Sequence, residues 1–298
     1  MELRHILCPI DFSEYSEHAL SHAAALARWY GSRLTLMHVW TISPAPIPSL
    51  EPTLVMPALP EQQTRIAEAL NEMATPLRDS GLKVSTAISE GSAVHEVIGL
   101  ATADAADLIV MGTHGRGGFE RFVLGSVTEK VLRKAPCPVL TVPRAVSGEA
   151  VDRVHYKRIL CPVDAPSSTS PELASALSLA KETDAQLTLL HVVEPIRTPP
   201  GLTGIDTYAY ETQLEADWRT RLHGVVGPDV RTWCRIDERV VKGRAAVSIL
   251  DLATEVHAEI IVMGVQGRGT LDLLLFGSTT HQVVRQASCP VWTIRAKP

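Results

Sequence analysis

Two glycine-rich stretches of the chain contain residue types that could hold a phosphate. The first, MGTHGRGGFERFVLGS, covers residues 111–126, and the second, MGVQGRGTLDLLLFGS, covers residues 263–278. Both have a glycine, two residues, a second glycine, nine residues and then Gly-Ser. Neither contains the lysine of a GxxxxGK[ST] loop. Glycine lets backbone N–H groups approach a ligand closely, so this spacing predicts phosphate binding by the main chain.

The elements on either side of the first stretch predict where such a phosphate would lie. DLIVMG predicts a buried strand that ends at Gly112, and SVTEKVLRKA predicts a helix with Ser126 as its N-cap. The loop between them therefore leads from the carboxyl end of a strand to a helix start, where N–H groups are unpaired. Arg116 and Arg121 could add positive charge at its rim. Glycines that only form tight turns are the competing interpretation.

The chain consists of two units of similar sequence. HILCPIDFS at 5–13 matches RILCPVDAP at 158–166, and KAPCPVLTV at 134–142 matches QASCPVWTI at 286–294. A repeat of about 150 residues is far longer than a solenoid unit of about 20 to 50 residues, so we interpret it as a duplicated domain. We expect a first domain at 1–144, a linker at 145–156 and a second domain at 157–298.

Strand and helix patterns alternate within each unit, which predicts an α/β doubly wound domain with a parallel sheet covered on both faces. In the first unit the expected strands are 5–10, 33–40, 83–91, 107–112 and 138–142, and the expected helices are 13–31, 61–81, 92–105 and 126–135. The ligand crevice of such a sheet lies beyond the carboxyl ends of its strands. An edge strand needs a partner, so we expect PVLTV and PVWTI to pair and join the units as an intra-chain pseudo-dimer.

Composition excludes several classes of protein. The net charge of −5 offers no basic field for nucleic acid, and no apolar run is long enough to cross a membrane. The N-terminal residues contain no secretory signal, and the five cysteines form no disulfide framework. We therefore expect a cytoplasmic protein with no nucleic-acid or membrane partner, whose cysteines are core residues.

Candidate catalytic and metal-binding side chains give weak patterns. His18 and His22 are four residues apart on an expected helix, but no third ligand has matching spacing, so no metal site is predicted. His38 and His191 end expected strands and are interpreted as hydrogen-bonding residues. One aspartate without a partner acid or nucleophile makes a poor catalytic site. We therefore assign no catalytic residue.

The glycine frame after an apolar strand, together with CPxD and the HV strand end, resembles the universal stress protein family in its ATP-binding branch. The resemblance covers both units and implies tandem five-stranded parallel domains of the adenine nucleotide alpha hydrolase type, a Rossmann-like fold. Family members pair as dimers, and two fused copies resemble such a dimer in one chain. Association of two whole chains is a further option that the sequence supports weakly.

The resemblance also implies a set of nucleotide-binding residues. Those near ribose, adenine and phosphates in the first unit would be Pro9, Asp11, Val39, Met111, Gly112, Gly115, Arg116, Gly125, Ser126 and Val127. Their counterparts in the second unit would be Pro162, Asp164, Val192, Met263, Gly264, Gly267, Arg268, Gly277, Ser278 and Thr279. The second unit departs from the first at several loop positions, so its ligand could differ.

The implied function is a stress-response protein that binds ATP or AMP as a regulatory or stabilising ligand, with Mg²⁺ as an optional companion of the phosphates. A slow ATP hydrolase is one alternative. A chaperone-like interaction protein that holds another small molecule is a second. The missing lysine and the missing paired acids count against fast phosphoryl transfer. The intact glycine frame counts against an empty site.

Overall fold

The structure, a computed structural model, describes residues 1–40, 60–115, 124–143, 156–164, 170–194, 207–265 and 277–295. The elements of the first half are β1 (His5–Pro9), α1 (Glu14–Tyr30), β2 (Arg33–Trp40), α2 (Pro60–Asp79), β3 (Lys83–Glu90), α3 (Ala93–Ala103), β4 (Leu108–Gly112), α4 (Ser126–Lys134) and β5 (Val139–Val142). Those of the second half are β6 (Arg158–Pro162), α5 (Pro171–Thr183), β7 (Gln186–Val193), α6 (Thr207–Val225), α7 (Pro228–Arg231), β8 (Arg235–Lys242), α8 (Ala245–Glu255), β9 (Ile260–Gly264), α9 (Ser278–Gln286) and β10 (Val291–Ile294).

Helix boundaries follow from the capping residues. Ser13 caps α1 through a capping box with Ser16, and Gly31 ends the helix in the left-handed region at φ 67°. The prediction that Ser126 is the N-cap of α4 is wrong. Gly125 is the cap, because its extended backbone (φ −56°, ψ 133°) precedes the helix while its carbonyl already accepts the N–H of Glu129 at 2.9 Å. Ser126 is the first helical residue.

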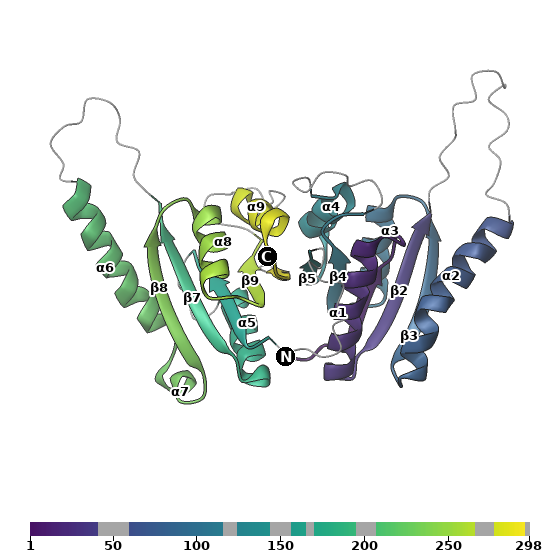
Figure 1. Cartoon of the computed structure of the whole chain (residues 1–298), viewed down its shortest axis with the longest axis horizontal. Coiled ribbons are helices and arrows are strands. Elements are labelled where there is room, and N and C mark those ends of the chain that lie inside the picture. Colours follow the sequence, from purple (N-terminus) through teal and green to yellow (C-terminus); the bar gives the residue numbers. More distant parts are fainter. Residues whose placement is uncertain are drawn as a thin grey trace, which may run out of the picture.

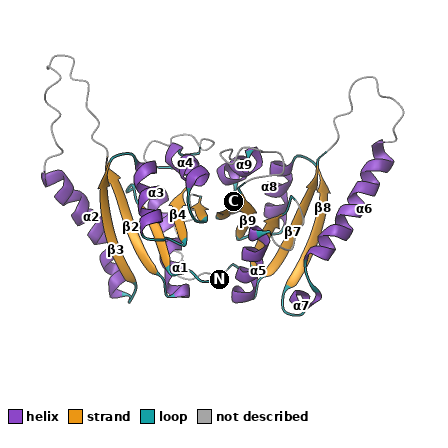
Figure 2. Cartoon of the chain, turned by 180° about the vertical axis from the view of Figure 1, so that it is seen from behind, coloured by secondary structure: helices purple, strands orange, loops and turns teal. Residues whose placement is uncertain are grey.

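The strands form one ten-stranded sheet in the order β3-β2-β1-β4-β5-β10-β9-β6-β7-β8. All pairs within a half are parallel, as predicted, and β5 and β10 pair antiparallel at the centre. The predicted pairing of the two edge strands is therefore confirmed, and two five-stranded sheets become one. Thr141 and Thr293 reinforce this junction: each hydroxyl donates to a carbonyl of the opposite strand, at 3.2 Å and 2.9 Å. Figures 1 and 2 show the halves side by side, with α2 and α6 at the two outer ends.

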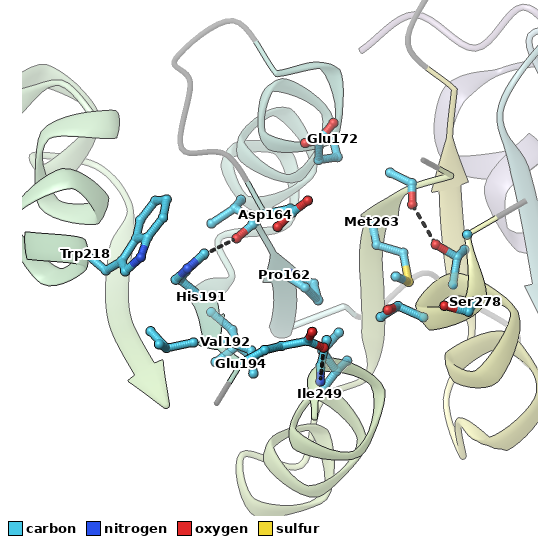
Figure 3. Close-up of a pocket in the computed structure, with 18 of the residues that line it drawn as sticks. Pro162, Asp164, Glu172, His191, Val192, Glu194, Trp218, Ile249, Met263 and Ser278 are labelled. Carbon is cyan, nitrogen blue, oxygen red and sulfur yellow. Dashed lines mark hydrogen bonds between the residues drawn. The ribbon is translucent and has the colours of Figure 1, made fainter. Parts of the chain in front are cut away.

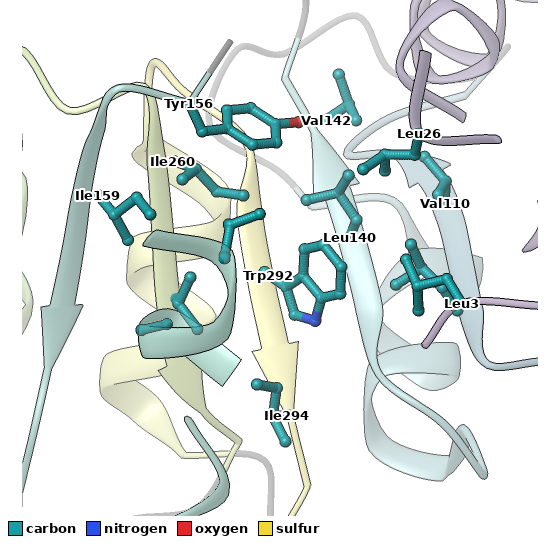
Figure 4. Close-up of a cluster of buried hydrophobic side chains, with 14 of the residues drawn as sticks. Leu3, Leu26, Val110, Leu140, Val142, Tyr156, Ile159, Ile260, Trp292 and Ile294 are labelled. Atoms are coloured by element: carbon teal, nitrogen blue, oxygen red, sulfur yellow. The ribbon is translucent and has the colours of Figure 1, made fainter. Parts of the chain in front are cut away.

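A hydrophobic core on one face of the sheet continues across the junction. This face carries α1 and α2 from the first half and α5 and α6 from the second. Trp292 of β10 is 1% exposed and belongs to the same cluster as Leu26, Leu140 and Ile159, so residues of both halves bury each other (Figure 4). Burial of large apolar side chains is the main favourable term in folding. The two halves are thus joined by a shared core as well as by strand pairing.

The other face is covered by α3, α4, α8 and α9. Its buried cluster contains Leu7 and Ile109 of the first half and Leu160 and Ile261 of the second. The five cysteines are free thiols, and burial raises the pKa of Cys137 and Cys289 to about 12. Such thiols are protonated at neutral pH. The prediction that the cysteines are core residues holds for the four buried ones, whereas Cys137 is partly buried against the core. No helix in the described ranges is long and apolar enough to span a membrane.

Buried polar groups also connect the two halves. His22 of α1 lies 3.3 Å from the hydroxyl of Tyr156, which precedes β6. The hydroxyl of Tyr30 donates to the carboxylate of Glu182 on α5. Burial, assisted by nearby His18, lowers the pKa of His22 to about 3. His18 and His22 contact each other edge-on, with ring centroids 5.0 Å apart. His22 is therefore a neutral residue of the junction.

Acid is expected to destabilise the chain through His22. The unfolded histidine has a pKa of about 6.5, so between pH 6.5 and about 3 the unfolded state binds a proton that the folded state does not. This contribution to stability is complete above about pH 6.5 and is lost as the pH falls. Between pH 7.5 and pH 5, the free energy of unfolding should fall by about 2 kcal/mol more in the wild type than in His22→Gln. Denaturant unfolding at the two pH values measures this difference. Equal losses of unfolding free energy in the two proteins would contradict the lowered pKa of His22.

Candidate functional site

The candidate site in each half lies where the strand order changes direction. In the first half β1 lies between β2 and β4, and in the second half β6 lies between β7 and β9. The helices that follow each central strand and its neighbour cover opposite faces of the sheet: α1 and α5 lie on one face, and α4 and α9 lie on the other. This divergence leaves a crevice beyond the carboxyl ends of the strands. Pro9 and Pro162 end these central strands, and Asp11 and Asp164 follow them. The predicted site residues thus lie at the carboxyl edge of the sheet.

The second half contains a cavity of about 670 Å³ at this edge (Figure 3). Every predicted second-unit residue within the described ranges lines it: Pro162, Asp164, Val192, Met263, Gly264, Gly277, Ser278 and Thr279. The other two predicted residues, Gly267 and Arg268, lie outside the described residues. Residues from four separate stretches of sequence therefore meet around one space.

One wall of the cavity is aromatic and apolar. Trp218 of α6 stacks on His191, with ring centroids 3.9 Å apart and planes at 27°. The Nδ1 atom of His191 is 2.8 Å from the carbonyl oxygen of Val163, and the guanidinium of Arg221 lies 5.0 Å from the Trp218 ring centroid. The interpretation of His191 as a hydrogen-bonding strand residue is confirmed, and the same holds for His38, whose Nδ1 is 2.7 Å from the carbonyl oxygen of Ile10. No sequence motif marks Trp218, because it lies on a helix outside the repeated motifs.

The floor of the cavity includes the start of α9. Gly277 is its N-cap, with an extended backbone (φ −58°, ψ 136°) and no side chain to accept the first N–H groups of the helix. Its own N–H donates to the carbonyl of Val265 at 3.2 Å, and the Thr280 hydroxyl donates to the carbonyl of Gly264 at 3.0 Å. These bonds fix the helix start against the end of β9. The N–H groups of the first turn have no preceding turn to pair with, so this position suits an anion.

Acidic residues also belong to the described lining. Besides Asp164, the cavity is lined by Glu172 in the first turn of α5 and by Glu194 after β7. Glu194 accepts the N–H of Ala245, the first residue of α8, at 3.4 Å. No sequence motif marks either glutamate, since neither belongs to the repeated stretches. Among the described residues no three His, Cys, Asp or Glu side chains converge to hold a metal ion.

The first half repeats the helix start and adds close backbone contacts. The Thr128 hydroxyl donates to the carbonyl of Gly112 at 2.9 Å, as Thr280 does in the second half. A Cβ atom at Gly112 would lie 2.8 Å from the Cβ of Tyr15, so this glycine allows α1 to pack against the end of β4. A Cβ at Gly115 would lie 2.4 Å from Oδ2 of Asp11. Asp11 and Gly115, 104 positions apart in sequence, are therefore neighbours.

The remaining first-half residues are placed as follows. Asp11 accepts the N–H and the hydroxyl of Ser13 at 3.1 Å and 2.5 Å, so its carboxylate is oriented by the cap of α1. Val39 and Val127 are partly buried against the core of the α4 face, and Met111 belongs to that core. Pro9 ends β1, and Gly125 and Ser126 begin α4. Arg116 and Arg121 lie outside the described residues, as does almost all of the proline-rich loop after β2.

A comparison with family models decides the affiliation of the chain. The model described as the universal stress protein family matches residues 2–143 and again residues 155–295. The chain belongs to the universal stress protein family. Its members are stress-response proteins, and this chain carries two copies of the family domain in tandem.

Individual members of the universal stress protein family cover one or both halves. A universal stress protein of Methanocaldococcus jannaschii is 34% identical over 140 residues, which is 47% of this chain and 81% of that protein. One from Mycolicibacterium smegmatis is 26% identical over 307 residues, which is 98% of this chain and 97% of that protein. The crystal structure of a universal stress protein from Archaeoglobus fulgidus has a TM-score of 0.68 and 22% identity, and the match covers 99% of this chain and 97% of that one. It supports the fold over the whole length.

Proposed function

We propose that this universal stress protein binds an adenine nucleotide, ATP or AMP, as a regulatory or stabilising ligand. The observation that carries the proposal is the convergence of Pro162, Asp164, Val192, Met263, Gly264, Gly277, Ser278 and Thr279 on one cavity of about 670 Å³. Pockets for small ligands have volumes of about 300 to 1,000 Å³ and combine apolar walls with a few polar groups. This cavity has both features.

The lining offers a distinct environment to each part of a nucleotide. Met263, Val192 and Pro162 supply apolar surface and main-chain groups for a base, and Asp164 supplies a carboxylate that can accept from ribose hydroxyls. The start of α9 at Gly277 and Ser278 offers N–H groups to a phosphate. Because no three described side chains converge on a metal position, any Mg²⁺ would enter with the phosphates. The proposal assigns no catalytic residue.

In the first half the arrangement of Asp11, Gly115 and Gly125 supports a second site of the same kind. Binding to the folded chain alone would stabilise it by about 2.7 kcal/mol at a ligand concentration one hundred times Kd. Mass spectrometry of the nucleotide released when the purified protein is denatured would identify the bound ligand. Calorimetry with ATP and AMP, together with phosphate release, tests the proposal. Absence of binding would refute it, and release at about 1 per second or faster would favour an enzyme.

In the first half, Gly115→Asp is expected to abolish nucleotide binding, whereas Asp11→Ala should weaken it about tenfold to a hundredfold. A side chain at position 115 must displace the Asp11 carboxylate, because its Cβ would lie 2.4 Å from Oδ2, and aspartate adds a like charge at the phosphate position. Gly115→Ala is the matched control without charge, and its nucleotide affinity should lie between those of Gly115→Asp and Asp11→Ala. Calorimetry of each variant measures the affinities. Wild-type affinity in Gly115→Asp would mean that the first glycine frame serves only the turn.

A further inference from the structure

An aromatic ring contacts a histidine near the end of β2 and of β7. In the first half this ring belongs to Phe12, whose centroid lies 4.7 Å from that of His38. In the second half it belongs to Trp218, whose centroid lies 3.9 Å from that of His191. The two rings come from different elements, because Phe12 lies in the loop after β1 and Trp218 lies on α6. The two halves therefore build the surroundings of this histidine differently.

The sequence accounts for this difference as an exchange of large and small residues. Phe12 corresponds in the repeat to Ala165, which lies outside the described residues. Trp218 of α6 stands where α2 has Leu70, since each is buried and is followed four residues later by another buried side chain. The first half thus has phenylalanine and leucine where the second has alanine and tryptophan. The aromatic ring is kept, and its origin moves from the loop to the helix.

In the second half this ring forms part of the cavity wall (Figure 3). Trp218, His191 and Leu214, which is one turn before Trp218 on α6, all line the cavity. Stacking on His191 and the guanidinium of Arg221, 5.0 Å from the ring centroid, orient the indole. His191 is oriented in turn, because its Nδ1 atom is 2.8 Å from the carbonyl oxygen of Val163. Protein contacts therefore hold both aromatic rings of the wall in place.

The aromatic wall lies on the side of the cavity where the proposed function places the base. Val192, whose main chain would hold adenine, follows His191 directly in β7. Ser278, at the proposed phosphate position, lies across the cavity from Trp218 (Figure 3). Stacking of a base on an aromatic side chain changes affinity by about tenfold to a hundredfold. A base held by Val192 is therefore within reach of a contact that can set selectivity.

We propose that Trp218 makes the second half selective for purine over pyrimidine nucleotides, through contact of the Trp218 and His191 rings with the base. The inference rests on the proposed function and names the residue that sets base selectivity in this half. A purine has two fused rings, so it covers more of the aromatic wall than the single ring of a pyrimidine. Trp218 is thus a specificity-determining residue as well as a packing residue of α6.

The test compares AMP with CMP, which differ only in the base, and uses the full chain. Gly115→Asp, which is expected to silence the first half, serves as the background. Calorimetry should give AMP an affinity at least about tenfold above that of CMP. Trp218→Leu, which introduces the first-half residue, should lower AMP affinity about tenfold and CMP affinity by at most about threefold. Binding of AMP should also change the tryptophan fluorescence of the background protein.

Trp218→Phe separates ring contact from packing. Phenylalanine is close to leucine in size but keeps an aromatic ring, so AMP affinity should stay within about threefold of that of the background protein. The fluorescence change on AMP binding should disappear in this variant, because the reporting indole is gone. Trp233→Leu is the matched control, since Trp233 is 39% exposed and does not line the cavity. It should leave both affinities unchanged.

The outcomes separate this inference from the proposed function. If the unmodified chain binds neither nucleotide, the proposed function fails. If the unmodified chain binds AMP and the background protein does not, or if the background protein binds AMP and CMP equally, the purine selectivity of the second half is refuted while nucleotide binding stands.

The variants test the role of Trp218 itself. An unchanged ratio of AMP to CMP affinity in Trp218→Leu would overturn it. Equal losses of AMP affinity in Trp218→Leu and Trp218→Phe would do the same, because the effect would then come from packing volume. If Trp218→Leu does not fold, the fluorescence measurement decides, since an undiminished AMP-induced change in Trp218→Phe would show that Trp218 does not contact the ligand.

Discussion

Gly277→Asp is expected to abolish nucleotide binding by the second half, with a loss of at least about a hundredfold in affinity. Aspartate is among the best N-cap residues, and the backbone at Gly277 (φ −58°, ψ 136°) is open to any amino acid. Its carboxylate would accept the N–H groups of Thr279 or Thr280 that a phosphate would otherwise use, and would repel the phosphate as well. The helix should therefore persist while the anion site disappears.

Gly277→Asn is the matched control for this prediction. Asparagine has the same shape and also caps helices, so it blocks the N–H groups without adding charge and should cost less affinity than aspartate. Calorimetry gives the affinities, and thermal unfolding without ligand checks that each variant is at least as stable as the wild type. Undiminished binding by Gly277→Asp would mean that the glycine frame serves only the turn, and the proposed phosphate position would be wrong.

Trp292→Ala is expected to lower the free energy of unfolding by about 3 to 5 kcal/mol, the usual cost of truncating a fully buried aromatic residue. Trp292 is 1% exposed on β10 at the junction, and Leu140 of β5 lies in the same cluster (Figure 4). The cavity left behind would loosen the packing of both halves against each other. Denaturant unfolding should then show a lower midpoint, and separate transitions for the halves would be a further sign of a weakened junction.

Trp292→Phe is the informative companion variant. The indole Nε1 of Trp292 is buried and has no hydrogen-bond partner among the described residues. Phenylalanine removes this unpaired donor while keeping most of the apolar surface, so its cost should be well below that of alanine. A loss from Trp292→Ala below about 1 kcal/mol would show that the junction depends on strand pairing rather than on the shared core.

Local sequence signals determined the elements and much of the candidate site. The alternation of apolar strands with amphipathic helices predicted the parallel α/β halves, and Ser13 and Gly31 marked the ends of α1 correctly. The duplicated glycine frame marked Gly264, Gly277 and Ser278, which line one cavity together with residues that the family resemblance implied. The predictions of strands and helices succeeded because they rest on short-range physics: strand burial, capping and the fixed order of strand, loop and helix. The one capping error, at Ser126, exchanged neighbouring residues that could both begin a helix.

Only the tertiary structure determined which distant residues share a site. Trp218, Glu172 and Glu194 come from separate elements, and no motif marks them, because a side chain reaches the cavity through helix packing rather than through its neighbours in sequence. The contact of Asp11 with Gly115 and the junction contact of His22 with Tyr156 likewise join residues about a hundred or more positions apart. The sequence alone determined that each half carries the same glycine frame between a strand and the start of the following helix. The charge and walls of the space beside it depend on how the helices pack against the sheet.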